Sequence, residues 1–138
     1  AVETIARFQQ SCDTLLGLNE SEAYQVARVL GYDGEQAVAT VAPFIRERLQ
    51  ISTVVVHPRA FAVAASAAGV VRVAGPFVEN PLISTGAGDH FNAGFCLGKL
   101  IGAENDVALQ LGVATSGYYV RTAKSPTANE LVAFLRGL

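Results

Sequence analysis

The 138-residue sequence has no methionine, no tryptophan and only two cysteines, Cys12 and Cys96. The cysteines lie far apart, and neither belongs to a CxxC motif or a His/Cys cluster, which argues against a zinc site. We therefore expect two buried free thiols in a reducing compartment, and a cytoplasmic protein. The missing methionine and a start inside an expected helix indicate a fragment of a longer chain.

Charge is also scarce, because charged residues make up 16% of the chain and ten Lys and Arg face twelve Asp and Glu. No basic excess exists to neutralise a phosphate backbone, so we expect no nucleic-acid partner. The most apolar stretch, residues 61–77, is interrupted by glycine, arginine and proline and cannot span a bilayer. A hydrophobic content of 51% excludes a disordered chain and is compatible with a homo-oligomer. The length suits one domain over residues 1–138.

Apolar residues recur at helical spacing near both ends of the chain, and short strand-like runs lie between them. The pattern predicts helices over residues 2–11, 19–31, 35–50, 89–101, 104–120 and 129–138, and strands over 14–18, 52–57, 61–66 and 70–74. Pro43 predicts a kink or an early break in its helix. Thr127 and Glu130 form a capping box before the last helix, and Tyr118 and Tyr119 are expected to be packing residues. This order predicts an α/β layered fold, with helices on the faces of a mostly parallel sheet and a β-hairpin.

The most informative segment is Thr85–Asp89, with the sequence TGAGD, where a loop runs into a helix. Gly86 and Gly88 have no side chains, so a ligand can approach the backbone closely. The first amides of a helix have no internal partner, and with the helix dipole they attract an anion. Asp89 is placed to accept a proton from a hydroxyl that attacks a phosphate. The alternative is an ordinary loop whose acid stabilises the helix dipole, and His90 either lines the site or lies on the helix surface.

The longer string resembles the signature of the ribokinase-like, or PfkB, carbohydrate kinases: TGAGDHF over residues 85–91, followed by AGF over 93–95. The resemblance implies a ribokinase-like layered fold. It also implies ATP-dependent phosphoryl transfer to a hydroxyl of a sugar or sugar-like substrate, with Mg²⁺ as cofactor. Asp89 would be the general base, and the anion hole would be formed by Thr85, Gly86, Ala87 and Gly88.

A second match lies at Asn19–Glu22, which has the N-x-x-E pattern of the same family. In the family, this pair helps to hold magnesium and the phosphates, largely through water. Such a role suits magnesium, because the ion usually keeps several waters. The spacing from Asn19 to Glu22 is also that of a capping box. The two interpretations are compatible, because one pair can cap a helix and face the water shell of a metal.

Two positions depart from the family pattern. Ile83 stands where the family commonly has an aspartate, and the turn over residues 57–62 lacks the glycines that tend to lie behind the nucleotide. In this turn, His57 and Arg59 are candidate nucleotide-binding residues. The alternatives are a structural histidine at a strand end and an arginine in solvent. Nucleotide binding by this turn is therefore an open question.

The resemblance extends over the whole chain, but it covers only the C-terminal, nucleotide-binding and catalytic portion of the family pattern. The portion that makes most sugar contacts has no counterpart here, so the sequence does not identify the acceptor. The main hypothesis is that the parent protein is a carbohydrate kinase that binds a sugar and a nucleotide. The alternative is a non-catalytic or truncated nucleotide-binding or assembly module of the same fold.

Overall fold

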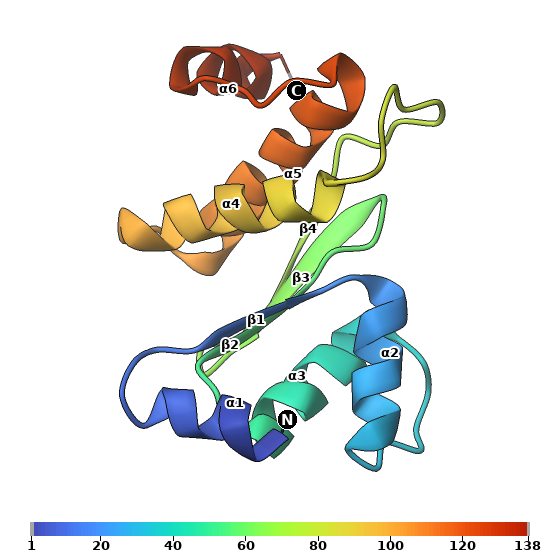
Figure 1. Cartoon of the computed structure of the whole chain (residues 1–138), viewed down its shortest axis with the longest axis vertical. Coiled ribbons are helices and arrows are strands. Elements are labelled where there is room, and N and C mark those ends of the chain that lie inside the picture. The colour runs from blue at the N-terminus through green and yellow to red at the C-terminus, as the bar shows by residue number, and fades with distance from the viewer. Residues whose placement is uncertain (1, 138) are drawn as a thin grey trace. The chain divides into compact units, whose positions relative to one another are not determined.

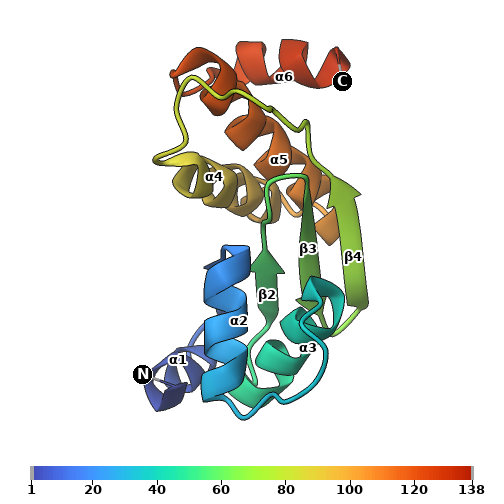
Figure 2. The ribbon, with the colours of Figure 1, turned by 90° about the vertical axis from the view of Figure 1, so that its right-hand side faces the viewer.

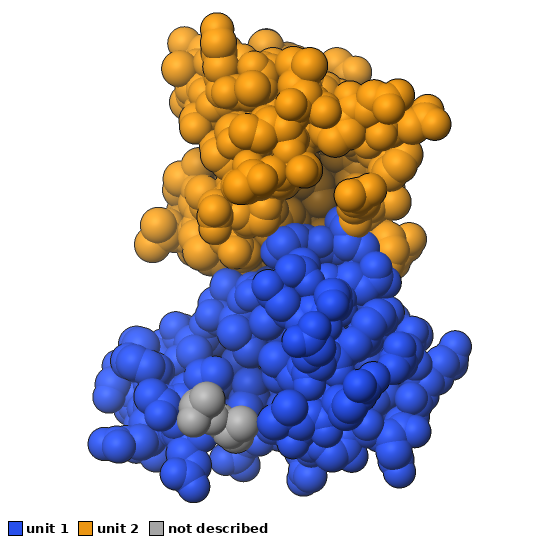
Figure 3. All heavy atoms as spheres, turned by 45° about the vertical axis from the view of Figure 1, so that its right-hand side comes forward, with its two compact units in different colours: residues 1–58, 63–71 blue, residues 59–62, 72–138 orange. Residues whose placement is uncertain are grey.

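The computed structural model describes residues 2–137, whose elements are shown from two directions in Figure 1 and Figure 2. The chain divides into two compact units, which are coloured separately in Figure 3. Unit 1 contains the residues up to 58 together with 63–71, and unit 2 contains 59–62 together with 72 onward. Each unit is described below by itself. The expectation of a single domain over residues 1–138 stays a prediction.

The helices of unit 1 are α1 (Val2–Gln9), α2 (Glu20–Val29) and α3 (Val38–Leu49), and each matches an expected helix. A capping box starts α2: the Glu22 amide donates to Asn19 Oδ1 at 2.9 Å, and the Asn19 amide donates to Glu22 Oε2 at 2.8 Å. Of the kink or early break expected at Pro43, the break is wrong, because α3 continues through this residue, and the kink stays a prediction. The carbonyl that loses its helical partner belongs to Ala39, an exposed residue where water can take the place of the missing amide.

One sheet has the strand order β1-β2-β3-β4 and is built from β1 (Leu15–Leu18), β2 (Thr53–Val56), β3 (Phe61–Ser66) and β4 (Gly69–Ala74). β1 and β2 are parallel, whereas β2 and β3 are antiparallel. The connection from β1 to β2 contains α2 and α3 and is long enough for a parallel crossover. The connection over residues 57–60 permits only an antiparallel return. The α/β class and the hairpin are confirmed, and the sheet of this chain is mixed rather than mostly parallel.

The core of unit 1 lies between α3 and the sheet. Every residue of β2 is buried. On α3, Val41, Ile45 and Leu49 repeat at intervals of four residues and form one buried stripe. Figure 1 shows α2 and α3 on the same side of β1 and β2. The start of α2, with Asn19 and Glu22, follows directly after the end of β1 in the chain.

Unit 2 contains α4 (Ala87–Leu100), α5 (Asn105–Thr122) and α6 (Ala128–Arg136), which match the last expected helices. α4 and α5 pack along each other (Figure 1). Gly94 permits the close approach, because a Cβ there would lie 2.5 Å from the Leu111 carbonyl oxygen and 2.5 Å from Thr115 Oγ1. Phe91 and Phe95 are buried nearby on α4. Gly94 and Phe95 of the AGF string therefore belong to the packing face of α4, whereas Ala93 is exposed.

Both cysteines are free and exposed, which corrects the expectation that they are buried. Cys96 directly follows the buried Phe95 on α4, and one residue step turns a helix by about 100°. Its side chain therefore points away from the packed face. Cys12 lies in the connection between α1 and β1. Within residues 2–137, no helix combines the length and the apolar content that crossing a membrane requires.

Candidate active site

The TGAGD segment forms the beginning of α4. Gly86 is the N-cap residue and has φ +86°, a left-handed conformation that favours glycine. The first helical hydrogen bond runs from the His90 amide to the Gly86 carbonyl at 3.1 Å. The amides of Gly88 and Asp89 precede this bond and lie at the positive end of the helix dipole. These two amides are the donors that the start of α4 offers to an anion.

One member of the expected anion hole is engaged within the loop. The Ala87 amide donates to the Ser84 carbonyl at 3.1 Å and closes a turn ahead of α4. An amide that already has a partner must give up that bond before it can bind an anion, so its net contribution is smaller. The expected contribution of the Ala87 amide is therefore reduced, whereas Gly86 shapes the turn before the amides of Gly88 and Asp89.

The loop that leads into α4 rests on the last turns of α5. The Leu82 amide donates to the Val120 carbonyl at 2.8 Å. The Tyr119 hydroxyl donates to the Thr85 carbonyl at 3.1 Å, although the two residues are 34 positions apart in the sequence. A Cβ at Gly86 would lie 3.2 Å from the Tyr119 hydroxyl. The position of the loop is therefore determined by α5 as well as by the glycines within it.

His90 joins the same loop to the segment that follows α5. Its Nδ1 lies 2.8 Å from the Gly86 carbonyl oxygen, and its Nε2 lies 2.9 Å from Ser125 Oγ. The ring stacks on Tyr119, with 3.6 Å between the ring centroids and 12° between the planes. Sequence reasoning left the role of His90 open and assigned Tyr119 to packing alone. No local pattern reveals these contacts, because they join segments that are distant in the sequence.

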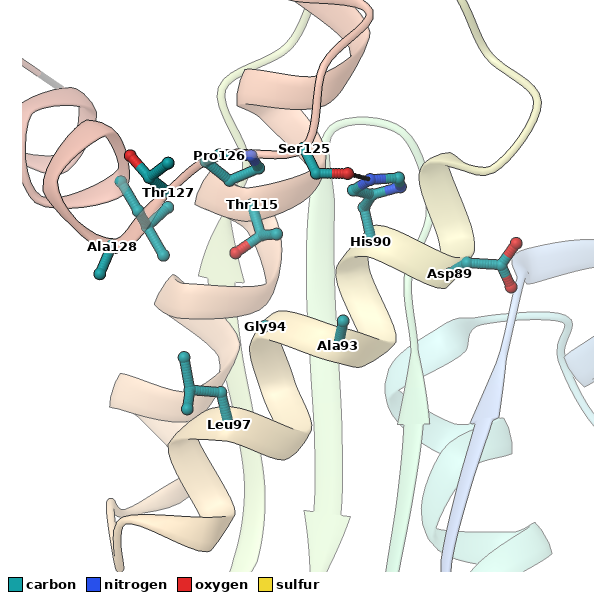
Figure 4. Close-up of a pocket in the computed structure, with 11 residues that line it drawn as sticks. Asp89, His90, Ala93, Gly94, Leu97, Thr115, Ser125, Pro126, Thr127 and Ala128 are labelled. Carbon is teal, nitrogen blue, oxygen red and sulfur yellow. Dashed lines mark hydrogen bonds between the residues drawn. The ribbon is translucent and has the colours of Figure 1, made fainter.

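Asp89 lies where the sequence predicted it, in the first turn of α4. Its side chain is exposed. Figure 4 shows the carboxylate projecting away from Ser125, whereas the His90 ring turns toward Ser125. A solvent-accessible carboxylate can accept a proton from a hydroxyl group brought next to it. The carboxylate and the amides of Gly88 and Asp89 belong to one helical turn.

A pocket of about 470 Å³ lies along α4, between this helix, the segment 125–127 and the start of α6 (Figure 4). Its apolar walls are formed by Ala93, Leu97, Pro126, Ala128 and Leu131, and its polar groups belong to Asp89, His90, Thr115, Ser125 and Thr127. Ligand pockets in proteins commonly combine apolar walls with a few polar groups that set orientation. This pocket therefore suits a flat molecule with an apolar face and a polar edge.

A capping box holds the α6 wall of this pocket, as the sequence predicted. The hydroxyl and the amide of Thr127 donate to Glu130 Oε2 at 2.6 and 2.8 Å, and the Tyr118 hydroxyl donates to Glu130 Oε1 at 2.9 Å. These bonds, above all the one from the Thr127 hydroxyl, lower the pKa of Glu130 to about 2. The bond to the Glu130 carboxylate raises the pKa of Tyr118. Tyr118 thus ties α5 to α6.

In unit 1, the Asn19–Glu22 pair has the geometry of a helix cap. The cap engages Asn19 Oδ1 and Glu22 Oε2 with backbone amides, and the Glu22 carboxylate is exposed. Among the residues that the structure describes, no group of three His, Cys, Asp or Glu side chains could hold a metal ion directly. Such a sparse donor set fits Mg²⁺ held through its own waters. The cap is confirmed, and the water-mediated magnesium role stays a prediction.

His57 and Arg59 have different surroundings. His57 is half-buried at the end of β2 in unit 1, and its amide donates to the Leu18 carbonyl at 3.0 Å. Burial lowers the pKa of the His57 imidazole, and the backbone hydrogen bond of His57 and the charge of Glu22 partly oppose this shift. His57 and Glu22 therefore belong to the same end of unit 1. Arg59 is exposed in unit 2. The proposed nucleotide contacts of His57 and Arg59 stay predictions.

The fold is that of the ribokinases. The ribokinase of Thermotoga maritima matches 95% of this chain with a TM-score of 0.77 and 22% sequence identity, and the match covers 44% of that protein. The ribokinase of Arabidopsis thaliana, solved with ribose and ATP, matches 95% of this chain with a TM-score of 0.76 and 19% identity, over 43% of its own length. These similarities confirm the ribokinase-like fold expected from the TGAGDHF string.

Sequence comparison is more specific. The family model described as prokaryotic ketohexokinase matches residues 1–138. A ketohexokinase of Haloferax volcanii is 30% identical over 137 residues, which make up 99% of this chain. The chain belongs to the prokaryotic ketohexokinase family, and the resemblance to carbohydrate kinases is confirmed. The chain spans 36% of the length of the Haloferax protein and less than half of the length of either ribokinase.

Proposed function

We propose that the protein to which this chain belongs transfers the γ-phosphoryl group of ATP to a hydroxyl of a ketohexose. The start of α4 is the observation that carries the proposal, because it combines the left-handed Gly86, the two amides of Gly88 and Asp89 and the exposed Asp89 carboxylate. The substrate class rests on the family, whose model and Haloferax relative are both named for ketohexose phosphorylation.

Asp89 is the general base in this proposal. The sugar hydroxyl oxygen forms a bond to the γ-phosphorus, the bond from that phosphorus to the bridging oxygen of ADP breaks, and the hydroxyl proton passes to the Asp89 carboxylate. The amides of Gly88 and Asp89 and the dipole of α4 stabilise the negative charge on the transferred group. Proton acceptance by a positioned base typically contributes about 10²- to 10⁴-fold to the rate.

The pocket beside α4 is the proposed site for the base of the nucleotide. Its apolar walls suit the face of an aromatic base, and the hydroxyls of Ser125 and Thr127 can pair with a polar edge. Asp89 and His90 line the same pocket, so a molecule bound there extends toward the start of α4. This continuity is what a nucleotide requires, with its base in an apolar slot and its phosphates at a helix N-terminus.

Asn19 and Glu22 are the proposed holders of hydrated Mg²⁺. The exposed Glu22 carboxylate attracts the cation, and the capping box fixes the orientation of that carboxylate. When bound with ATP, Mg²⁺ neutralises phosphate charge. The Glu22 charge also opposes the lowering of the His57 pKa, so the Glu22 carboxylate acts electrostatically on the end of β2.

Two substitutions in the full-length protein that contains this chain test the proposal. Asp89→Asn should reduce turnover of a ketohexose with MgATP by about 10²-fold or more while MgADP binds with little change, because only the base is lost. Gly88→Val should abolish MgADP binding in calorimetry, because a branched side chain blocks the approach to the amides. Lys99→Gln, at the far end of α4, is the control and should match the parent protein in both assays.

Each result has a defined meaning. Unchanged turnover of the Asp89→Asn variant would remove Asp89 from the mechanism. Failure of the folded parent protein to bind MgADP would favour the non-catalytic module instead. Faster turnover of ribose or of an aldohexose than of any ketohexose would reject the substrate class and leave the reaction type intact.

A further inference from the structure

The two peptide groups that flank Gly86 are each held by a side chain. The carbonyl before Gly86, that of Thr85, accepts a hydrogen bond from the Tyr119 hydroxyl at 3.1 Å. The carbonyl of Gly86 itself lies 2.8 Å from Nδ1 of His90. The two side chains are in turn stacked on each other, with 3.6 Å between their ring centroids. His90 and Tyr119, called here the aromatic clamp, thus contact the peptide carbonyls before and after the Cα atom of Gly86.

The chemistry of the partners determines which ring nitrogen carries the hydrogen when His90 is neutral. A carbonyl oxygen can only accept, so Nδ1 of His90 must carry a hydrogen directed at Gly86. In a neutral ring Nε2 then has a lone pair, and it accepts the hydroxyl hydrogen of Ser125 at 2.9 Å. Both ring nitrogens therefore have a partner of the correct type, and the orientation of the ring is fixed.

Fixing these carbonyls also fixes amides, because a peptide group is planar. In a trans peptide the amide hydrogen points opposite to the carbonyl oxygen of the same group. Tyr119 therefore directs the Gly86 amide by holding the Thr85 carbonyl. His90 directs the Ala87 amide, which donates to Ser84, by holding the Gly86 carbonyl. The direction in which α4 begins follows from these two peptide planes.

We propose that His90 and Tyr119 are positioning residues, which hold the Gly86 turn in its left-handed conformation and so aim the Gly88 and Asp89 amides at the phosphate. The proposal rests on the proposed function for the identity of the anion. Glycine at position 86 is the most flexible residue type in the loop, and the clamp adds two side-chain hydrogen bonds to the backbone bonds made by the Gly86 carbonyl and the Ala87 amide. The clamp therefore reduces the conformational entropy that this loop loses when a ligand binds.

The first test does not depend on any ligand. Long-range ¹H–¹⁵N spectra of the full chain above pH 8 should show His90 with a proton on Nδ1 and none on Nε2. Tyr119→Phe keeps the stacked ring and loses the bond to Thr85, so the amide resonance of Gly86 should shift in this variant. A bare Nδ1 in His90, or an unmoved Gly86 resonance in Tyr119→Phe, would overturn the clamp.

The second test links the clamp to binding of MgADP in calorimetry. Tyr119 does not line the pocket, so a loss in Tyr119→Phe cannot come from a missing contact with the base. We expect about five- to tenfold weaker binding, the effect of one lost hydrogen bond that positions the loop. His90→Gln should weaken binding by about tenfold, and His90→Asn should recover part of this loss, because an Asn side-chain nitrogen can take the place of Nδ1.

The two tests separate the clamp from the proposed function. If the parent protein shows the Nδ1 proton but fails to bind MgADP, the proposed nucleotide binding is refuted, while the clamp remains as a structural feature. Equal MgADP affinity in the parent protein and in Tyr119→Phe overturns the positioning role. If His90→Gln does not fold, Tyr119→Phe alone decides, because it removes a single oxygen atom.

Discussion

Replacing Gly94 by alanine is expected to destabilise unit 2. An added Cβ would lie 2.5 Å from the Leu111 carbonyl oxygen and 2.5 Å from Thr115 Oγ1, whereas real Cβ atoms are essentially never closer than 3.0 Å to such neighbours. Thr115 itself donates to the Leu111 carbonyl at 2.7 Å, so the two obstructing atoms are bonded to each other and cannot move apart easily. α4 and α5 must therefore separate by about half an ångström.

Two effects of opposite sign set the magnitude. Alanine is a better helix former than glycine by about 1 kcal/mol, which favours the variant. Overpacking a close contact costs about 1–3 kcal/mol, and the upper part of that range applies when the obstructing atom belongs to the backbone. The net expectation is a free energy of unfolding lower by about 1–2 kcal/mol. In a chain of this size, this corresponds to a Tm lower by about 5 °C.

Urea and thermal unfolding followed by circular dichroism measure this change. Gly137→Ala is the matched control, because a Cβ there would meet the Phe134 carbonyl oxygen at 3.6 Å, an ordinary contact. We expect that control to differ from the parent chain by less than about 0.5 kcal/mol. A Gly94→Ala variant as stable as the parent chain, or more stable, would show that helix propensity dominates and that the close helix contact is not structurally required.

Two further predictions concern pH. Burial lowers the pKa of His57 in the folded state, so below about pH 6.5 the unfolded chain binds a proton more readily than the folded chain. The free energy of unfolding should therefore decrease as the pH decreases below about 6.5. His57→Gln should flatten this dependence in urea unfolding at pH 5.5 and 7.5; an unchanged slope would contradict the assignment. The pKa of Glu130 is lowered from 4.5 to about 2, so its contribution to stability is complete above pH 4.5 and is lost as pH falls toward 2. A carboxyl NMR titration should find this low pKa and a higher one in Thr127→Val; a value near 4.5 in the parent chain would refute the capping geometry.

Features with short-range causes could be predicted from the sequence. The capping boxes at Asn19–Glu22 and Thr127–Glu130 need only a spacing of three residues, and both are present. The helix that starts within the TGAGD segment was also predictable, because its glycines and its apolar periodicity are adjacent in the chain. The parallel pairing of β1 and β2 was harder to predict, since a run of apolar residues does not reveal the direction of its neighbour.

Other features depend on which side of a helix faces the protein interior. Cys96 was expected to be buried because free cysteine commonly is, but its position on α4 turns it outward. Pro43 was expected to kink or break its helix, yet α3 continues through it because the affected carbonyl lies where water can replace the lost bond. In both cases the composition was informative, and the side of the helix on which the residue lies decided the outcome.

By itself, the sequence determined where α4 begins and that Asp89 lies in its first turn, because both follow from the order of residues in Thr85–Asp89. Only the tertiary structure decided what holds the turn before α4. The Tyr119 hydroxyl on α5 donates to the Thr85 carbonyl, and the His90 ring that stacks on Tyr119 lies against the Gly86 carbonyl. The physical reason is that a peptide plane can be oriented by any donor that folding brings within reach, and such donors leave no local pattern in the chain.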